Sequence, residues 1–276
     1  MSIVFHKMHG AGNDFVLLDL RDQDYSLDPR SAGLISDRHR GVGCDQILVV
    51  LKPAQPKNVA CFEIWNSDGS QALQCGNGAR CIGLYLELNG DIDGESFNLE
   101  SPAGNIVMQR FADGQFEVNM GVPDFEPAKI PLNLTPIDNR YRLESPWGQL
   151  EFSAVSVGNP HALVLIDDIG DISIQDIGAF ISTHDSFPQG CNVGFVQLEN
   201  RGQIKLRVYE RGAGETLACG SGACAAVAIL RQTGRVDDVV DVLLPGGHLV
   251  IKWPGNQQPI KMKGPAEHVF RGTLNG

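Results

Sequence analysis

Alternating apolar and polar positions mark a strand in each half of this chain. Residues 204–209, Ile-Lys-Leu-Arg-Val-Tyr, alternate strictly, which is the period-2 signature of a strand with one buried face. Residues 60–65, Ala-Cys-Phe-Glu-Ile-Trp, carry a noisier form of the same pattern. Turns that contain glycine follow both segments, at residues 66–70 and 210–214, so each strand is predicted to end there.

A continuous apolar run downstream predicts a buried helix. Residues 223–230, Ala-Cys-Ala-Ala-Val-Ala-Ile-Leu, are apolar on every face, and Thr233-Gly234 follows them. The run is far shorter than the roughly 20 apolar residues that span a bilayer, so we expect a helix buried inside a sheet. Residues 81–88 continue similarly in the first half and stop at Asn89-Gly90, where glycine permits a left-handed helix cap.

The two halves also share their short motifs. Cys-Gly-Asn-Gly-Ala at residues 75–79 recurs as Cys-Gly-Ser-Gly-Ala at 219–223, an offset of 144 (219 − 75). Three further matches keep the same order at nearly the same offset: Gly12-Asn13 with Gly158-Asn159, Cys44 with Cys191, and Gly121 with Gly264. Ordered matches at a nearly constant spacing indicate two homologous halves. We therefore predict a sheet-rich α+β protein with one central helix in each half, joined near the proline-rich residues 119–148.

Composition narrows the class of partners. The 276 residues include 22 Lys and Arg against 33 Asp and Glu, a net charge of −11. Such a surface repels phosphate backbones and anionic lipids, so nucleic acid and membranes are poor candidates as partners. The first residues show no basic segment followed by an apolar one, so we expect a cytoplasmic protein.

Seven cysteines, an odd number, argue against a disulfide framework. The closest pairs, Cys75 with Cys81 and Cys219 with Cys224, do not have the spacing of a zinc site. No cofactor or metal is expected, and none of the seven histidines makes a case for metal binding. Most of the thiols should be small buried side chains in the core.

Cys75 and Cys219 differ from the other cysteines because each is predicted to open a helix and is followed by Gly-x-Gly. The first turn of a helix has backbone N–H groups without partners, and the helix dipole is positive there. Glycines let an anion approach those N–H groups closely. The same field should lower the pKa of the thiol. Each segment is thus predicted to hold a carboxylate beside a reactive sulfur.

Two such thiols suit the inversion of a carbon stereocentre. One thiolate removes a proton from one face of the carbon, and one thiol returns a proton to the other face. Amide N–H groups that hold the carboxylate stabilise the charge that develops on it. A lone cysteine in a soluble protein is more often a core residue than a catalyst, so the prediction depends on the duplication.

The two Cys-Gly-x-Gly-Ala segments and five further motifs resemble those of diaminopimelate epimerases. The similarity covers almost the whole chain, and the most specific block is residues 209–224, Tyr-Glu-Arg-Gly-Ala-Gly-Glu-Thr-Leu-Ala-Cys-Gly-Ser-Gly-Ala-Cys. The other matching blocks are residues 8–15, 37–46, 66–70, 75–81, 158–161 and 192–195.

The resemblance implies an isomerase, a cofactor-independent epimerase that interconverts LL- and meso-2,6-diaminopimelate in lysine and peptidoglycan biosynthesis. It implies an α+β fold of two pseudo-symmetric domains, each a mostly antiparallel sheet or barrel around a central helix, with the site in the cleft between them. The expected domains are residues 1–118, to which the tail 265–276 returns, and residues 119–264. A homodimer is what the family suggests.

The resemblance also implies roles for individual residues. Cys75 and Cys219 form the acid–base pair, and Gly76-Asn77 and Gly220-Ser221 hold the carboxylate at the reacting centre. His161 and Glu210 are candidates for tuning the pKa of a thiol. Side chains at family positions that bind substrate are Asn13, Gln46, Asn66, Asn159, Asn192, Glu210 and Arg211. Arg211 can pair with a carboxylate and Glu210 with an ammonium, which a substrate with two amino-acid heads requires.

Four other functions compete with this one. A two-cysteine proline or hydroxyproline racemase would leave the polar set without a second charged head to bind. A phenazine-type isomerase would work without thiols, and a two-lobed amino-acid-binding protein would bind without proton exchange. A zinc module is disfavoured by the cysteine spacings.

Overall fold

The computed structural model describes residues 2–23, 25–138, 140–170 and 172–275. The chain folds into two compact units, Met1–Asn119 together with Lys263–Gly276, and Met120–Met262. We call these unit 1 and unit 2. The domains expected from sequence end at residues 118 and 264, whereas the units change after Asn119 and Met262.

Unit 1 is a mixed sheet in which antiparallel neighbours predominate. Its strands follow the order β18–β1–β2–β3–β4–β6–β7–β8, with the short β5 on β4, and only the pairs β2–β3 and β4–β6 in this order are parallel. The strands are β1 (Ser2–Gly10), β2 (Asn13–Asp19), β3 (Gln46–Leu51), β4 (Ala60–Asn66), β5 (Gln71–Ala72), β6 (Ser96–Ser101), β7 (Gly104–Arg110), β8 (Phe116–Asn119) and β18 (Glu267–Asn275). The helices are α1 (Pro29–Ser36) and α2 (Gly76–Leu88).

Unit 2 repeats this plan. Its strands follow the order β9–β10–β11–β12–β13–β15–β16, with β14 on β13, and β11–β12 and β13–β15 are the parallel pairs in this order. The strands are β9 (Tyr141–Ser145), β10 (Gly148–Ser156), β11 (Pro160–Leu165), β12 (Asn192–Asn200), β13 (Gln203–Glu210), β14 (Gly214–Thr216), β15 (Val239–Leu244) and β16 (Gly247–Lys252), and β17 (Lys261–Gly264) leads back to unit 1. The helices are α3 (Ile174–Ser182) and α4 (Gly220–Gln232).

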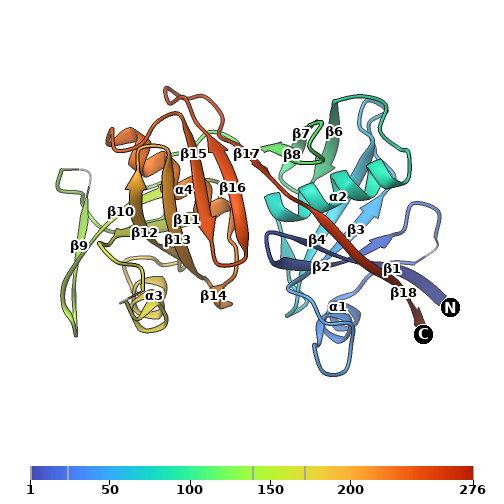
Figure 1. The fold of residues 1–276 in the computed structure, drawn as a ribbon. Coiled ribbons are helices and arrows are strands. Elements are labelled where there is room, and N and C mark those ends of the chain that lie inside the picture. The colour runs from blue at the N-terminus through green and yellow to red at the C-terminus, as the bar shows by residue number, and fades with distance from the viewer. Residues whose placement is uncertain (1, 24, 139, 171, 276) are drawn as a thin grey trace. The chain divides into compact units, whose positions relative to one another are not determined.

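Strands and helices follow one another in the same order along the chain in the two units (Figure 1). In unit 1, α1 connects the first parallel pair of strands and α2 the second; in unit 2, α3 and α4 occupy the same two places. The matching order of strands, crossovers and helices confirms the prediction of an α+β protein with two pseudo-symmetric halves.

The two long helices form the centre of the units. Helix α2 packs against β1, β2, β3, β8 and β18, and α4 packs against β10, β11, β12, β13 and β16. Every residue from Ala223 to Leu230 is buried, as its apolar sequence predicts. Each helix is therefore enclosed by strands drawn from distant parts of its own sheet, and the segments that precede the helices are held in place by that packing.

A tight hairpin places the first polar residue of the site. Gly10 pairs with Asn13, so β1 and β2 are joined by the two residues Ala11 and Gly12, with φ of 53° and 87°. Positive φ at both central positions belongs to the turn type whose twist suits a hairpin. The turn fixes Asn13 as the first residue of β2.

No helix among the described residues is both long and apolar enough to cross a lipid bilayer.

Candidate active site

Cys75 is the N-cap residue of α2, as the sequence predicts for a cysteine that opens a helix. Its backbone is extended, and its sulfur accepts a hydrogen bond from the backbone N–H of Gly78 at 3.4 Å. Gly78 leaves little room here, because a Cβ at this position would lie 2.8 Å from Leu48 Cδ2. The thiol thus lies at the positive end of a buried helix, beside N–H groups that can receive an anion.

Two asparagines surround this sulfur. Asn13 Oδ1 lies 3.9 Å from Cys75 Sγ and accepts a hydrogen bond from Asn77 Nδ2 at 3.3 Å. Asn77, in the first turn of α2, is almost completely buried, and its Oδ1 accepts from Arg80 Nη2 at 2.9 Å. Three of the residues proposed from sequence, Asn13, Cys75 and Asn77, therefore lie together in unit 1.

Gln46 and Asn66 form a second polar group in unit 1. They face each other where β3 begins and β4 ends, and Gln46 Nε2 donates to Asn66 Oδ1 at 2.8 Å. Asn66 Nδ2 donates in turn to Ser70 Oγ at 3.0 Å. Gln46 Oε1 is buried, and no described residue is hydrogen-bonded to it, so it is able to accept a hydrogen bond from a bound molecule.

Cys219 is likewise the N-cap residue of α4, with an extended backbone, but its side-chain contacts differ from those of Cys75. Its thiol donates to Glu210 Oε2 at 3.2 Å, and its sulfur lies 3.5 Å from Ser221 Oγ. Burial first, and then the negative charge of Glu210, raise the pKa of the Cys219 thiol well above its usual range. The sequence-based expectation that the helix field lowers this pKa is wrong at Cys219, because burial and a carboxylate outweigh the partial charge of the helix end.

Thr216 completes the surroundings of Cys219, and sequence reasoning gave it no role. Its hydroxyl donates to Glu210 Oε1 at 2.5 Å, so that each carboxylate oxygen of Glu210 has a partner. Thr216 ends β14, which pairs with the end of β13 where Glu210 lies. The only sequence signal for it is its place in the block of residues 209–224.

His161 acts on this group through Asn159. His161 Nε2 lies 3.0 Å from Asn159 Oδ1, and Asn159 Nδ2 donates to Ser221 Oγ at 3.4 Å. Burial, followed by the nearby charge of Arg211, lowers the pKa of His161 to about 3. The imidazole is therefore neutral at neutral pH, which makes it a fixed polar support for Asn159.

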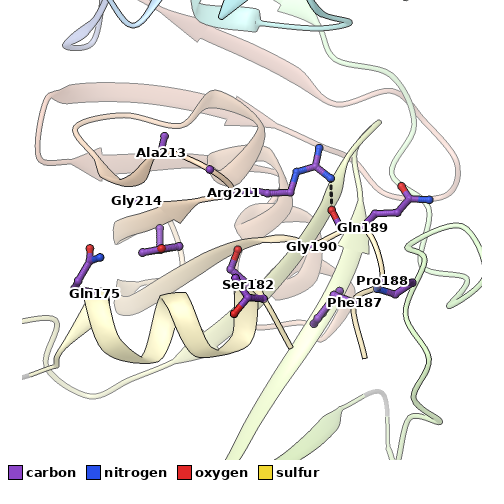
Figure 2. Close-up of a pocket in the computed structure, with 12 residues that line it drawn as sticks. Gln175, Ser182, Phe187, Pro188, Gln189, Gly190, Arg211, Ala213 and Gly214 are labelled. Atoms are coloured by element: carbon purple, nitrogen blue, oxygen red, sulfur yellow. Dashed lines mark hydrogen bonds between the residues drawn. The ribbon is translucent and has the colours of Figure 1, made fainter. Parts of the chain in front are cut away.

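Arg211 lines a cavity of about 580 Å³ in unit 2 (Figure 2), and Asn192 is bonded to its backbone. Asn192 Oδ1 accepts from the backbone N–H of Arg211 at 2.9 Å, and the guanidinium of Arg211 donates to the Gln189 carbonyl at 2.6 Å. The cavity also borders on Gln175 and Ser182 from α3. Arg211 thus presents a cation at a pocket whose walls are formed by backbone and neutral side chains.

The sites in the two units are equivalent in position and similar in chemistry. Each has a thiol at a helix start, N–H groups behind it and an oxygen acceptor beside it, a set that can hold a carboxylate and transfer a proton. Among the described residues, no group of three or more His, Cys, Asp and Glu side chains is arranged to hold a metal ion.

One family model matches most of the chain. The family model described as diaminopimelate epimerase matches residues 5–126 and 153–269. A diaminopimelate epimerase from Xanthomonas euvesicatoria pv. vesicatoria is 49% identical over 272 residues, which is 98% of this chain and 96% of that protein.

Solved structures share the fold at low sequence identity. A hydroxyproline epimerase from Agrobacterium vitis, with bound trans-4-hydroxy-L-proline, has a TM-score of 0.72 at 16% identity, covering 99% of this chain and 92% of the other. A PhzF-family phenazine biosynthesis protein from Bacillus anthracis has a TM-score of 0.72 at 14% identity, with 100% and 99% covered. The fold is therefore common to proteins with different names, one an epimerase and one a phenazine biosynthesis protein.

Proposed function

The chain belongs to the diaminopimelate epimerase family, and on that premise we propose that it interconverts LL- and meso-2,6-diaminopimelate. Cys75 and Cys219 act as the acid–base pair of this isomerase, and the reaction uses no cofactor. One observation carries the proposal: the two units have the same topology, and each begins its enclosed helix with Cys-Gly-x-Gly-Ala.

Each thiol serves one face of the α-carbon. The thiolate of one cysteine removes the α-proton, the thiol of the other delivers a proton to the opposite face, and the roles exchange in the reverse direction. The substrate carboxylate is held by Gly76-Asn77 and Gly220-Ser221, where N–H groups and the helix dipole stabilise the negative charge that develops during deprotonation.

The other polar residues recognise the rest of the substrate. The substrate-binding set is Asn13, Gln46, Asn66, Gly76, Asn77, Asn159, Asn192, Glu210, Arg211, Gly220 and Ser221. Arg211 offers several N–H donors for the distal carboxylate, and the buried acceptor Gln46 Oε1 suits an ammonium. Glu210 tunes the pKa of the Cys219 thiol by direct contact. His161 acts on the same group indirectly, by holding Asn159.

The cellular setting is part of the same proposal. Diaminopimelate is a precursor of lysine and of peptidoglycan, so a cytoplasmic enzyme is expected. The net charge of −11 supports a small-molecule substrate rather than a nucleic acid or a membrane surface.

A homodimer is supported by exposed apolar side chains on the paired strands β1 and β18, namely Val4, Val269 and Phe270. The two homologous epimerase domains of the proposal are residues 1–118 with the tail 265–276, and residues 119–264.

Proton NMR in D₂O tests the proposed activity. Reduced protein is incubated with LL-diaminopimelate, and the α-proton signal and the meso isomer are followed together. We expect the signal to disappear as the meso isomer forms, because the returning proton comes from a thiol that exchanges with solvent. An unchanged signal with folded, reduced protein contradicts the proposal; proline and simple amino acids are then the next substrates to test.

A further inference from the structure

The segment 37–46 lies against the start of β2. It resembles a family motif, but only Gln46 of this segment has a part in the chemistry described above. Arg38 Nη2 donates to Asp14 Oδ1 and to Asp45 Oδ1, both at 2.7 Å. Asp45 Oδ2 accepts from Asn13 Nδ2 at 2.9 Å and from the backbone N–H of Asp14 at 3.1 Å. An ion pair in this segment is therefore bonded directly to the asparagine that faces Cys75.

This contact determines which end of the Asn13 amide faces the sulfur. An asparagine amide can be turned by 180°, which exchanges a donor for an acceptor. Asp45, paired with Arg38, has only acceptors to offer, so the NH₂ group of Asn13 lies towards it. The oxygen of Asn13 is consequently directed at Cys75 Sγ, 3.9 Å away.

Arg80 imposes the same orientation from the other side. A guanidinium has only donors, so the oxygen of Asn77 lies towards Arg80 Nη2 at 2.9 Å. The NH₂ group of Asn77 then points to Asn13 Oδ1 at 3.3 Å. The chain of hydrogen bonds runs without a break from Arg80 through Asn77 and Asn13 to Asp45. A donor at one end and an acceptor at the other leave one arrangement for both amides.

We propose that Arg38 and Asp45 are positioning residues, which hold the oxygen of Asn13 towards the Cys75 thiol. Neither touches the sulfur; both act through Asn13. The role rests on the proposed function, in which Cys75 exchanges a proton with the substrate. The exposed pair Arg40–Asp37 in the same segment, at 2.8 Å, is by contrast a local contact that does not reach Asn13.

The orientation has a chemical consequence. A carbonyl oxygen accepts a hydrogen bond from S–H but repels a thiolate, whereas an NH₂ group would stabilise the thiolate. Asn13 therefore favours the protonated form of Cys75, and the N–H of Gly78 favours the ionised form.

Charged or titratable groups in and around this chain of hydrogen bonds are Lys7 on β1, Asp14 on β2, Arg38 and Asp45 in the segment, and Arg80 and Cys81 on α2. Partial burial acts to raise the pKa of Asp14, but hydrogen bonds from Arg38 and Lys7 outweigh it and lower that pKa. This carboxylate is therefore ionised.

The test compares two arginines of one segment. The variants R38A and R40A are alkylated with iodoacetamide over a range of pH, and mass spectrometry of peptides gives the rate at Cys75 and, as an internal reference, at Cys219. Without Arg38, Asp45 Oδ1 is no longer fixed and the carboxylate is held only at Oδ2, by Asn13 and the backbone N–H of Asp14, so it can move away and allow Asn13 to turn. R38A is therefore expected to alkylate Cys75 about three to ten times faster than wild type at pH 7.5, the range that one ordinary hydrogen bond spans. Loss of the Arg38 charge by itself would slow this reaction, so a faster rate reports the turn of Asn13. R40A should match wild type, and R38K should lie between R38A and wild type.

The isosteric variant D45N provides the test if R38A does not fold. An asparagine at position 45 can pair with Asn13 in either orientation, so a smaller increase at Cys75 is expected. Equal rates of Cys75 alkylation in R38A and R40A over the pH range overturn the proposal. If R38A does not fold, equal rates in D45N and wild type overturn it instead. An equal increase in the rate at Cys219 also overturns it, because it indicates a general loosening of the fold. Since alkylation uses no substrate, this outcome is independent of the epimerase assay: a wild-type protein that does not epimerise diaminopimelate overturns the proposed function alone.

Discussion

The sulfurs of Cys75 and Cys219 occupy equivalent places in the two units but face different acceptors. At Cys75 the acceptor is the neutral amide oxygen of Asn13, 3.9 Å away, and at Cys219 it is the carboxylate of Glu210, 3.2 Å away. Cys219 also has Ser221 where Cys75 has Asn77. A duplicated helix start thus supplies the same thiol twice, and the neighbouring strands give each thiol its own environment.

The supporting asparagines differ in the same sense. Asn13 is held by the charged Asp45 and presents its oxygen to Cys75, whereas Asn159 is held by the neutral His161 and presents its NH₂ group to Ser221. A reversible proton transfer needs one thiol and one thiolate at the start. Both acceptors favour the protonated thiol, the charged carboxylate more strongly than the neutral amide, so the two cysteines differ in how readily each ionises.

The largest effect is expected from removing either sulfur. We expect C75S and C219S each to lower the rate of epimerisation by about 10²- to 10⁴-fold, the usual contribution of a general acid or base. Serine is too weak an acid to replace the thiol at neutral pH. C61S, which changes a half-exposed cysteine on β4, is the control and should retain activity.

The variants C75S and C219S also allow the two thiols to be compared one at a time, by following the incorporation of deuterium at the α-carbon of each isomer. Each retains one base and should exchange the α-proton of at most one isomer, a different isomer for each variant. Retained epimerisation in both C75S and C219S would contradict the two-thiol mechanism.

A smaller effect is expected from neutralising the carboxylate beside Cys219. In E210Q the thiol loses a negative neighbour, so the pKa of Cys219 should fall and its alkylation at pH 8 should become faster, while epimerisation slows by about tenfold or more. E215Q is the matched control, because Glu215 on β14 forms an ion pair with Arg207 at 2.7 Å and not with a thiol. Equal effects of E210Q and E215Q on Cys219 would show that the contact with Glu210 does not tune this thiol.

The remaining effect concerns stability at low pH, and it tests the state of His161, which supports Asn159. Folding lowers the pKa of His161 from 6.5 to about 3, so below pH 6.5 the unfolded chain binds a proton that the folded protein does not bind. Between pH 7 and pH 5 this linkage should reduce the free energy of unfolding by about 2 kcal/mol. H161Q does not titrate and should lose that much less than wild type, as measured by urea unfolding at both pH values. If both proteins lose the same free energy, His161 is not held neutral by the fold.

Much of the architecture could be predicted from local pattern. The alternation at residues 204–209 predicts β13, the apolar run 223–230 predicts a helix that is buried, and the recurrence of Cys-Gly-x-Gly-Ala predicts two equivalent helix starts. These signals are readable because the periods of strands and helices, and the cost of leaving apolar side chains in water, act over a few neighbouring residues.

The surroundings of each sulfur were not predictable in this way. The field at a helix start suggests a lowered pKa for both thiols, but burial and Glu210 raise the pKa of Cys219. Thr216 and Asp45 are bonded to site residues that differ from them by 6 and 32 positions along the chain, and no periodicity links them. Only a folded sheet shows that these side chains meet.

By itself the sequence determined the duplication, the enclosed helices and the identity of the two cysteines that open them. Tertiary structure decided which acceptor faces each sulfur, which end of Asn13 is turned towards Cys75, and which direction the pKa of Cys219 takes. The reason is physical: secondary structure follows from short-range pattern, whereas desolvation and hydrogen-bond direction depend on atoms that only the packed sheet brings within a few ångströms of one another.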